Sequence, residues 1–170
     1  MSAAVVGPLV YEEQVVVTLV PAGATWGITS LTAPDAAEIA AGTDVSSYIP
    51  KSGGIGFPST RNAVDTAAID RTFNSEHPGS RGGPLTLQFK MRNRNGDTAA
   101  WDLMKAGNVP FDAVVGYQGS NATAGDEVDI WRGFAQMPLR NNPGPDEEQR
   151  FTVEFRVQED ALARVVAGGS

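Results

Sequence analysis

Residues 84–119, PLTLQFKMRNRNGDTAAWDLMKAGNVPFDAVVGYQG, carry the clearest structural pattern in the chain. Apolar and polar side chains alternate over residues 84–92, and this period of two predicts a strand with one buried face. The buried set is Leu85, Leu87, Phe89 and Met91, and the outward set is Thr86, Gln88, Lys90 and Arg92. Residues 110–117 predict the next strand, so the segment is expected to fold as strand, short helix and strand.

The helix of this unit is predicted over residues 98–106. Asp97 follows the turn residues 93–96, where its carboxylate is placed to accept hydrogen bonds from the free amides of the first helical turn. The spacing of the apolar residues predicts a stripe that packs on a sheet. That stripe consists of Ala100, Leu103 and Met104. Gly107 supplies the left-handed conformation that ends the helix.

Composition points to a single domain rich in strands. The chain has 170 residues, enough for one core, and its 19 glycines and 11 prolines favour many turns between strands over long helices. No apolar run approaches the roughly 20 residues of a membrane helix. The first residues lack the basic region of a secretory signal peptide, so neither a membrane span nor secretion is expected.

Charge and residue usage exclude several classes of site. The chain contains no cysteine and one histidine, His77, which excludes disulfides and Cys-ligated zinc and argues against imidazole triads. The net charge is −7, with 20 acidic residues against 13 basic ones. Because tight DNA binding requires clustered Lys and Arg, an acidic chain is expected to tolerate DNA nearby without holding it.

The rest of the chain adds further strands and one short helix. Strands are predicted at residues 14–20, which are apolar on both faces, at 126–133 and at 149–157, with weaker candidates at 26–29, 55–57 and 68–73. Residues 31–42 predict a short helix that begins with a box of Thr32 and Asp35 and closes at Gly42. The predicted fold class is therefore mainly β, a sandwich or barrel-like fold with one flanking helix and a short N-terminal helix.

A long polar segment separates the two halves of the pattern. Residues 59–83 show little periodicity, and residues 75–83 contain too many breakers for a regular element to be expected there. A loop longer than about 12–15 residues in a compact domain is usually functional or disordered. We therefore hypothesise that it orders against another molecule. Residues 1–12 are interpreted as an N-terminal arm and residues 159–170 as a C-terminal tail.

No motif for catalysis, cofactor binding or metal binding is present. The chain lacks the phosphate-binding, dinucleotide-binding and zinc-protease patterns. Asp126, Glu127 and Asp129 lack the spacing of a calcium loop and are interpreted as a solvated strand face. His77 is interpreted as a loop residue. We expect no enzyme, no cofactor and no metal, and a structural or interaction protein instead.

The order and spacing of these segments resemble the major tail tube protein of long-tailed bacteriophages with non-contractile tails. Residues 31–47, LTAPDAAEIAAGTDVSS, are similar to the early segment of tail proteins from phages of actinobacteria. The polar segment with RNAVD at residues 61–65 and the later run over residues 97–129 also fit. The resemblance covers about residues 10–158.

The resemblance implies a structural virion protein of the phage tail. Its fold is expected to be a β-sandwich with a flanking helix, and hexameric rings are expected to join inner strands into a continuous β-barrel. By the same resemblance, the rings are expected to stack into an acidic-lined tube that conducts the genome at ejection. The implied partners are further copies of the chain, the tape measure protein, tail terminator and distal tail proteins, and double-stranded DNA that passes without specific binding. Assembly is expected in the host cytoplasm, with no membrane involved.

The same analogy assigns two sets of site residues. The first set lies in the inter-subunit loop and consists of Arg61, Asp65, Ile69, Phe73, His77 and Arg81. The second set takes outward positions of the strands as lumen-facing and consists of Gln88, Lys90, Asp129, Thr152 and Glu154. Lys90, Arg150 and Arg156 depart from an acidic lining, and pairing with carboxylates of adjacent strands would offset their charge.

Two other classes of protein remain as alternatives. A tail-terminator or head–tail joining protein would form a single ring and stop, so filament formation separates it from a tube protein. A secreted carbohydrate-binding β-sandwich would use its tryptophans, Trp26, Trp101 or Trp131, to stack on sugars. These residues are spread along the chain and are interpreted as core or interface anchors.

Overall fold

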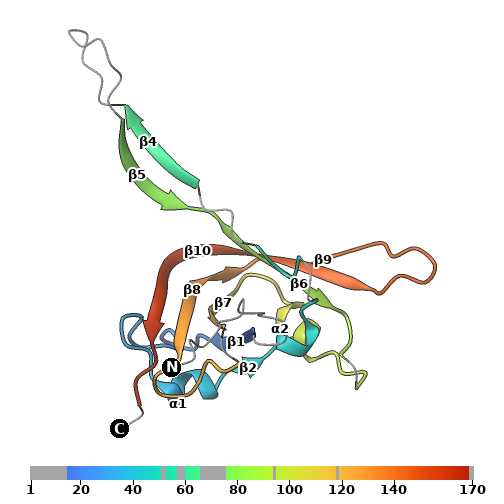
Figure 1. Cartoon of the computed structure of the whole chain (residues 1–170). Helices are drawn as coiled ribbons and strands as arrows, with labels where there is room; N and C mark the ends of the chain where they lie inside the picture. Colours follow the sequence, from blue (N-terminus) through green and yellow to red (C-terminus); the bar gives the residue numbers. More distant parts are fainter. Residues whose placement is uncertain are drawn as a thin grey trace, which may run out of the picture. The chain divides into compact units, whose positions relative to one another are not determined.

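The computed structural model describes residues 15–50, 53–56, 60–65, 76–93, 95–117 and 119–168, and these residues form a mainly β fold (Figure 1). The strands of the main sheet are β1 Val16–Pro21, β2 Thr43–Asp44, β3 Ile55–Gly56, β6 Pro84–Lys90, β7 Val109–Gly116, β8 Glu127–Ala135, β9 Leu139–Arg140 and β10 Arg150–Val165. The helices are α1 Ala36–Ala40 and α2 Ala99–Met104, with a 3-10 turn at Ser46–Tyr48. The predicted fold class, with its two short helices, is confirmed.

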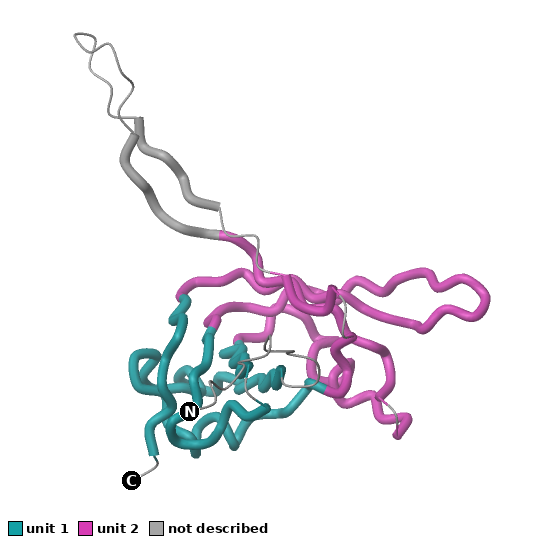
Figure 2. Tube along the Cα trace, viewed as in Figure 1, with its two compact units in different colours: residues 1–46, 111–130, 160–170 teal, residues 47–110, 131–159 magenta. Residues whose placement is uncertain are grey.

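The main sheet runs in the order β2-β1-β7-β8-β10-β6-β3, and β9 also pairs with β10. Its two outermost strands, β2 and β3, are two residues long. Strands β4 Thr60–Asp65 and β5 Glu76–Gly82 form a separate two-stranded sheet. The chain divides into two compact units, each built from segments that are distant in the sequence (Figure 2). A single domain over residues 1–170 stays a prediction.

The first unit comprises residues 1–46, 111–130 and 160–170. Its core gathers β-branched and aliphatic side chains from β1, α1, β7, β8 and the end of β10. The members are Val20, Ile28, Ile39, Val114, Val128, Ile130, Ala161 and Val166. Strand β1 is buried on both faces from Val17 to Val20, as its apolar sequence predicts.

Two local predictions in this unit are wrong. Helix α1 begins four residues after Thr32, because Asp35 is its N-cap and accepts a hydrogen bond from the amide of Ala37 at 2.8 Å. Residues 26–29 form bends and no strand. There the amide of Ile28 donates to the buried carboxylate of Asp112 at 2.9 Å, so a side chain supplies the partner that a strand would have supplied.

The second unit comprises residues 47–110 and 131–159, and its core lies on one face of β6 and β10. The antiparallel register sets Phe151 opposite Phe89, Val153 opposite Leu87 and Phe155 opposite Leu85. All six side chains are buried. Trp101 of α2 packs edge-on against Phe151, with ring centroids 5.2 Å apart. Of the predicted stripe of α2, Ala100 and Met104 are buried, whereas Leu103 is half-buried.

The start of α2 differs from the prediction. The helix begins at Ala99, with Thr98 at the N-cap position and no capping hydrogen bond from its side chain. Asp97 lies in the preceding turn, where its amide donates to the side-chain oxygen of Asn93 at 3.0 Å. The side-chain oxygen of Asn93 also accepts from the amide of Asn95, so Asn93 organises this turn and Asp97 is not the predicted N-cap of the helix. Gly107 has a φ of 65°, which confirms the predicted helix end.

Two segments expected to be irregular contain strand. Residues 76–82 form β5 despite Pro78 and Gly79, and the pairing with β4 contains a register shift between Arg61 and Ala63 that accommodates the irregular sequence. Strand β10 runs on to Val165, so residues 159–165 belong to a strand. The weaker candidate at 68–73 and the arm at 1–12 lie outside the described residues.

Candidate functional site

The outward face of β6 and β10 is a polar surface built by regular structure in the second unit. Because side chains alternate along a strand, burying the aromatic set directs the other set to the opposite face. The register sets Arg150 opposite Lys90, Thr152 opposite Gln88 and Glu154 opposite Thr86. We call these residues, together with Arg156 and Glu148, the polar face.

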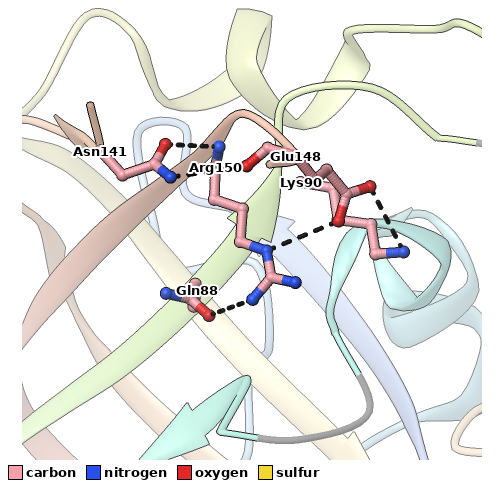
Figure 3. Close-up of polar contacts among 5 residues, drawn as sticks. All are labelled: Gln88, Lys90, Asn141, Glu148 and Arg150. Carbon is pink, nitrogen blue, oxygen red and sulfur yellow. Dashed lines mark hydrogen bonds and ion pairs between the residues drawn. The ribbon is translucent and has the colours of Figure 1, made fainter. Parts of the chain in front are cut away.

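A single carboxylate joins the two cations at one end of the polar face (Figure 3). One oxygen of Glu148 lies 3.5 Å from Nζ of Lys90, and the other lies 3.5 Å from Nε of Arg150. Arg150 also donates through Nη1 to the side-chain oxygen of Gln88 at 3.4 Å. The three charged side chains are between 34% and 42% exposed, so the group is accessible to a ligand.

The turn between β9 and β10 fixes the position of Glu148. The amide of Arg150 donates to Oδ1 of Asn141 at 2.6 Å, and the amide of Asn141 donates to the carbonyl of Arg150 at 3.0 Å. Nδ2 of Asn141 also donates to the backbone carbonyl of Glu148 at 3.5 Å. Asn141 therefore closes the turn by bonding to main-chain atoms of Glu148 and Arg150. The side chain of Glu148 is not used in these bonds and contacts Lys90 and Arg150.

The polar face is close to charge balance. Its cations are Lys90, Arg150 and Arg156, and its carboxylates are Glu148 and Glu154. The charges of Lys90, at the end of β6, and Arg150, at the start of β10, are both offset by Glu148. The expected partners were carboxylates of adjacent strands, whereas Glu148 belongs to the turn before β10. The described part of this face is thus a mixed surface, and the acidic balance of the chain resides elsewhere.

Asp129, the remaining predicted lumen residue, lies in the first unit and has structural partners. Its Oδ2 accepts a hydrogen bond from the hydroxyl of Tyr117 at 3.0 Å, and its Oδ1 accepts from the amide of Ala163 at 2.7 Å. Ala163 has a φ of 52°, an uncommon conformation for a non-glycine residue, and the hydrogen bond that its amide donates to Asp129 stabilises this conformation. Burial, and then the neighbouring Asp129 carboxylate, raises the pKa of Tyr117 well above its usual range.

We predict that Tyr117→Phe leaves the tyrosinate absorbance of the folded protein unchanged up to about pH 11, because Tyr117 stays protonated where an ordinary tyrosine ionises near pH 10. Tyr117 ionises near that value only in the unfolded chain. The stability that its raised pKa provides is therefore present below about pH 10 and falls as the pH rises further. Ultraviolet titration of the two proteins checks this. A smaller signal from the variant already near pH 10 would contradict it.

The family of the protein follows from its sequence as a whole. A family model described as "Phage tail tube protein" matches residues 10–170. The chain belongs to that family. No curated protein matches its sequence. Among solved structures, a chain of "Cryo-EM structure of the anti-feeding prophage (AFP) baseplate, 6-fold symmetrised" has a TM-score of 0.56 at 13% identity, covering 97% of this chain and 99% of that one, and so has the same fold.

Membership confirms the predicted resemblance at the level of the tail tube family and makes the chain a structural protein of the phage tail. The refinement to non-contractile tails and to phages of actinobacteria stays a prediction. In the described residues, no group of three His, Asp or Glu side chains could hold a metal ion. No helix of the described part is long and apolar enough to span a membrane.

The residues predicted for the inter-subunit loop of this tail tube protein divide between described and undescribed segments. Arg61 and Asp65 belong to β4, and His77 and Arg81 belong to β5, so His77 is a strand residue and not a loop residue. The register sets Arg61 opposite Arg81 and His77 opposite Val64. Ile69 and Phe73 lie outside the described residues.

Four of the five predicted lumen residues of the tail tube protein share one face, namely Gln88, Lys90, Thr152 and Glu154. Asp129 is not among them. The sequence prediction missed Glu148 and Asn141, which complete the polar cluster. If the alternation of residues 150–157 is extended two positions toward the N-terminus, Glu148 falls on the same face as Arg150. This pattern would have identified Glu148. Nothing in the pattern identifies Asn141, because its role depends on the turn geometry.

Proposed function

We propose that copies of this chain assemble into hexameric rings, that the rings stack into the tail tube of a phage, and that the genome passes through this tube at ejection. The observation that carries the proposal is the match of the tail tube family model to residues 10–170. The likeness to a chain of a six-fold symmetrised baseplate supports the hexamer. In this role the chain acts as a passive conduit and needs no catalytic site.

The edges of the main sheet support assembly through strands. Among the described residues, strand β3 pairs with Thr86 and Leu87 of β6, and the carbonyl of Gly54 accepts one further hydrogen bond from the amide of Gln88. Much of the outer edge of β6 is therefore not paired with a strand among the described residues. An open edge invites pairing with another chain, and closing sheets across neighbouring copies removes it. A ring of such copies forms a barrel.

The charges of the chain support passage of DNA without retention. Each phosphate neutralised by Lys or Arg strengthens binding and would act as a brake on sliding. The net charge of −7 opposes such binding by the protein as a whole, and two of the three cations of the polar face, Lys90 and Arg150, are paired with Glu148. We propose that this face lines the bore, with Gln88, Lys90, Thr152 and Glu154 toward the DNA.

Contacts with other molecules follow from the same proposal. The β4–β5 hairpin, with its predicted residues from Arg61 to Arg81, reaches a neighbouring subunit or the next ring. The arm at residues 1–12 and the segment at residues 159–170 contribute to stacking. The tape measure, tail terminator and distal tail proteins bind the tube inside and at its ends, and assembly takes place in the host cytoplasm before the virion is complete.

Electron microscopy of the purified chain at increasing concentration tests the proposal. We expect tubes with a regular axial repeat and end-on views of six-fold symmetry. Single rings that never stack would instead identify a terminator or joining protein. A monomer at every concentration in sedimentation, with glycan binding, would overturn the proposal in favour of a carbohydrate-binding domain.

A further inference from the structure

We infer that Glu148 is an internal charge shield, which occupies Lys90 and Arg150 so that the polar face does not bind the phosphates of DNA. The inference rests on the proposed function, in which this face meets DNA. It concerns a residue outside the predicted lumen set. The geometry that carries it is the bridge of one carboxylate, with each oxygen 3.5 Å from a different cation (Figure 3).

The bridge reduces an electrostatic repulsion that the sequences of β6 and β10 create. Lys90 and Arg150 are directly opposite each other on adjacent strands, an arrangement in which like charges repel. Without a carboxylate between them, the two side chains would present a paired cationic site of the kind that binds phosphate. Glu148 lies within ion-pair distance of both side chains, so it relieves the repulsion and lowers the positive charge that a phosphate would meet.

Neighbouring carboxylates do not share this role. Glu147 is adjacent in sequence, but its Oε2 accepts a hydrogen bond from the amide of Gly144 at 2.9 Å within the turn. Asp146 is exposed in the same turn, where it adopts a φ of 67°. The described contacts of Lys90 and Arg150 with carboxylates are those with Glu148.

Glu148→Gln in the full chain isolates the shield. The substitution removes one negative charge and keeps the size of the side chain, and the backbone carbonyl that Asn141 contacts is unaffected. Because exposed ion pairs contribute little to stability, we expect a melting temperature close to that of the unsubstituted protein. The matched control is Glu147→Gln, which changes the net charge equally and leaves the bridge intact.

Fluorescence anisotropy with a labelled DNA duplex of random sequence measures the effect across a range of salt concentrations. We expect the unsubstituted chain and Glu147→Gln to bind negligibly. Two freed cations should add about 2 to the number of phosphates neutralised, so the affinity of Glu148→Gln should rise about tenfold between about 200 mM and about 50 mM salt. Adding Lys90→Gln and Arg150→Gln to this variant should abolish the gain.

Equal DNA binding by Glu148→Gln and Glu147→Gln would overturn the shield, as would a gain that persists without Lys90 and Arg150. These measurements use protomers kept below the concentration at which they polymerise, so they are independent of tube formation. Electron microscopy of the unsubstituted protein reports on the proposed function separately. Absence of rings and tubes there would count against the conduit and not against the shield.

Discussion

Replacing residues 61–81 with a short Gly-Ser linker is expected to leave a folded protomer that no longer forms tubes. Strands β4 and β5 make a sheet of their own, so the main sheet loses no strand. Thr60 and Gly82 are paired across the hairpin, which places their Cα atoms about 5 Å apart, within reach of a short linker. Circular dichroism and thermal melting report the fold, and electron microscopy reports the tubes.

Removal of the whole hairpin is preferable to removal of residues 75–83 alone. A single residue, Gly83, separates β5 from β6, and removal of β5 alone would leave β4 unpaired. A second variant, Ile69→Ser with Phe73→Ser, retains both strands and tests these two predicted inter-subunit residues. Normal tubes from the excised protein would refute the role of the hairpin in assembly. Normal tubes from the second variant alone would assign that role to the strands.

Phe151→Ala is expected to lower the free energy of unfolding by about 3–5 kcal/mol, as for other large-to-small changes at buried aromatic positions. Phe151 is 1% exposed, stacks on Phe89 at a centroid distance of 5.1 Å and meets the ring of Trp101 edge-on at 5.2 Å. Its removal leaves both rings without a partner on one side. Urea unfolding of the protomer measures the change.

Glu154→Ala is the control for this substitution. Glu154 lies on the same strand but on its exposed face, and substitutions of this kind usually change stability by no more than about 0.5 kcal/mol. The comparison therefore tests which face of β10 is buried. Similar losses from the two variants would show that the aromatic set does not form the core of this unit.

The sequence was sufficient where a single periodicity controlled the outcome. The alternation over residues 84–90 and 150–155 predicted which side chains of β6 and β10 are buried, because a pleated strand allows only two arrangements and the aromatic set selects one. The apolar sequence of β1 likewise predicted burial on both faces. Four of the predicted lumen residues therefore share a face, although their position in a bore stays a prediction.

The sequence was insufficient to predict local structure where more than one residue was able to make the same hydrogen bonds, or where contacts with distant segments decided the outcome. Asp97 and Asn93 are both capable of organising the turn before α2, and only the backbone path shows that Asn93 does so. Strand β10 continues past the exposed residues 158–160 because bonds from other segments hold its far end, such as that between Asp129 and Ala163. Neither outcome is encoded in a local pattern.

The origin of the counter-charge at Lys90 and Arg150 has a consequence for tubes of any diameter. Glu148 is supplied in cis, from the turn that leads into the same strand, so each subunit brings its own neutralising group. The ratio of Glu148 to these two cations is then the same in every subunit, because all three residues belong to one polypeptide. It does not depend on the number of subunits in a ring or on the rotation between successive rings. A bore built this way would have the same local balance of positive and negative charge along its entire length.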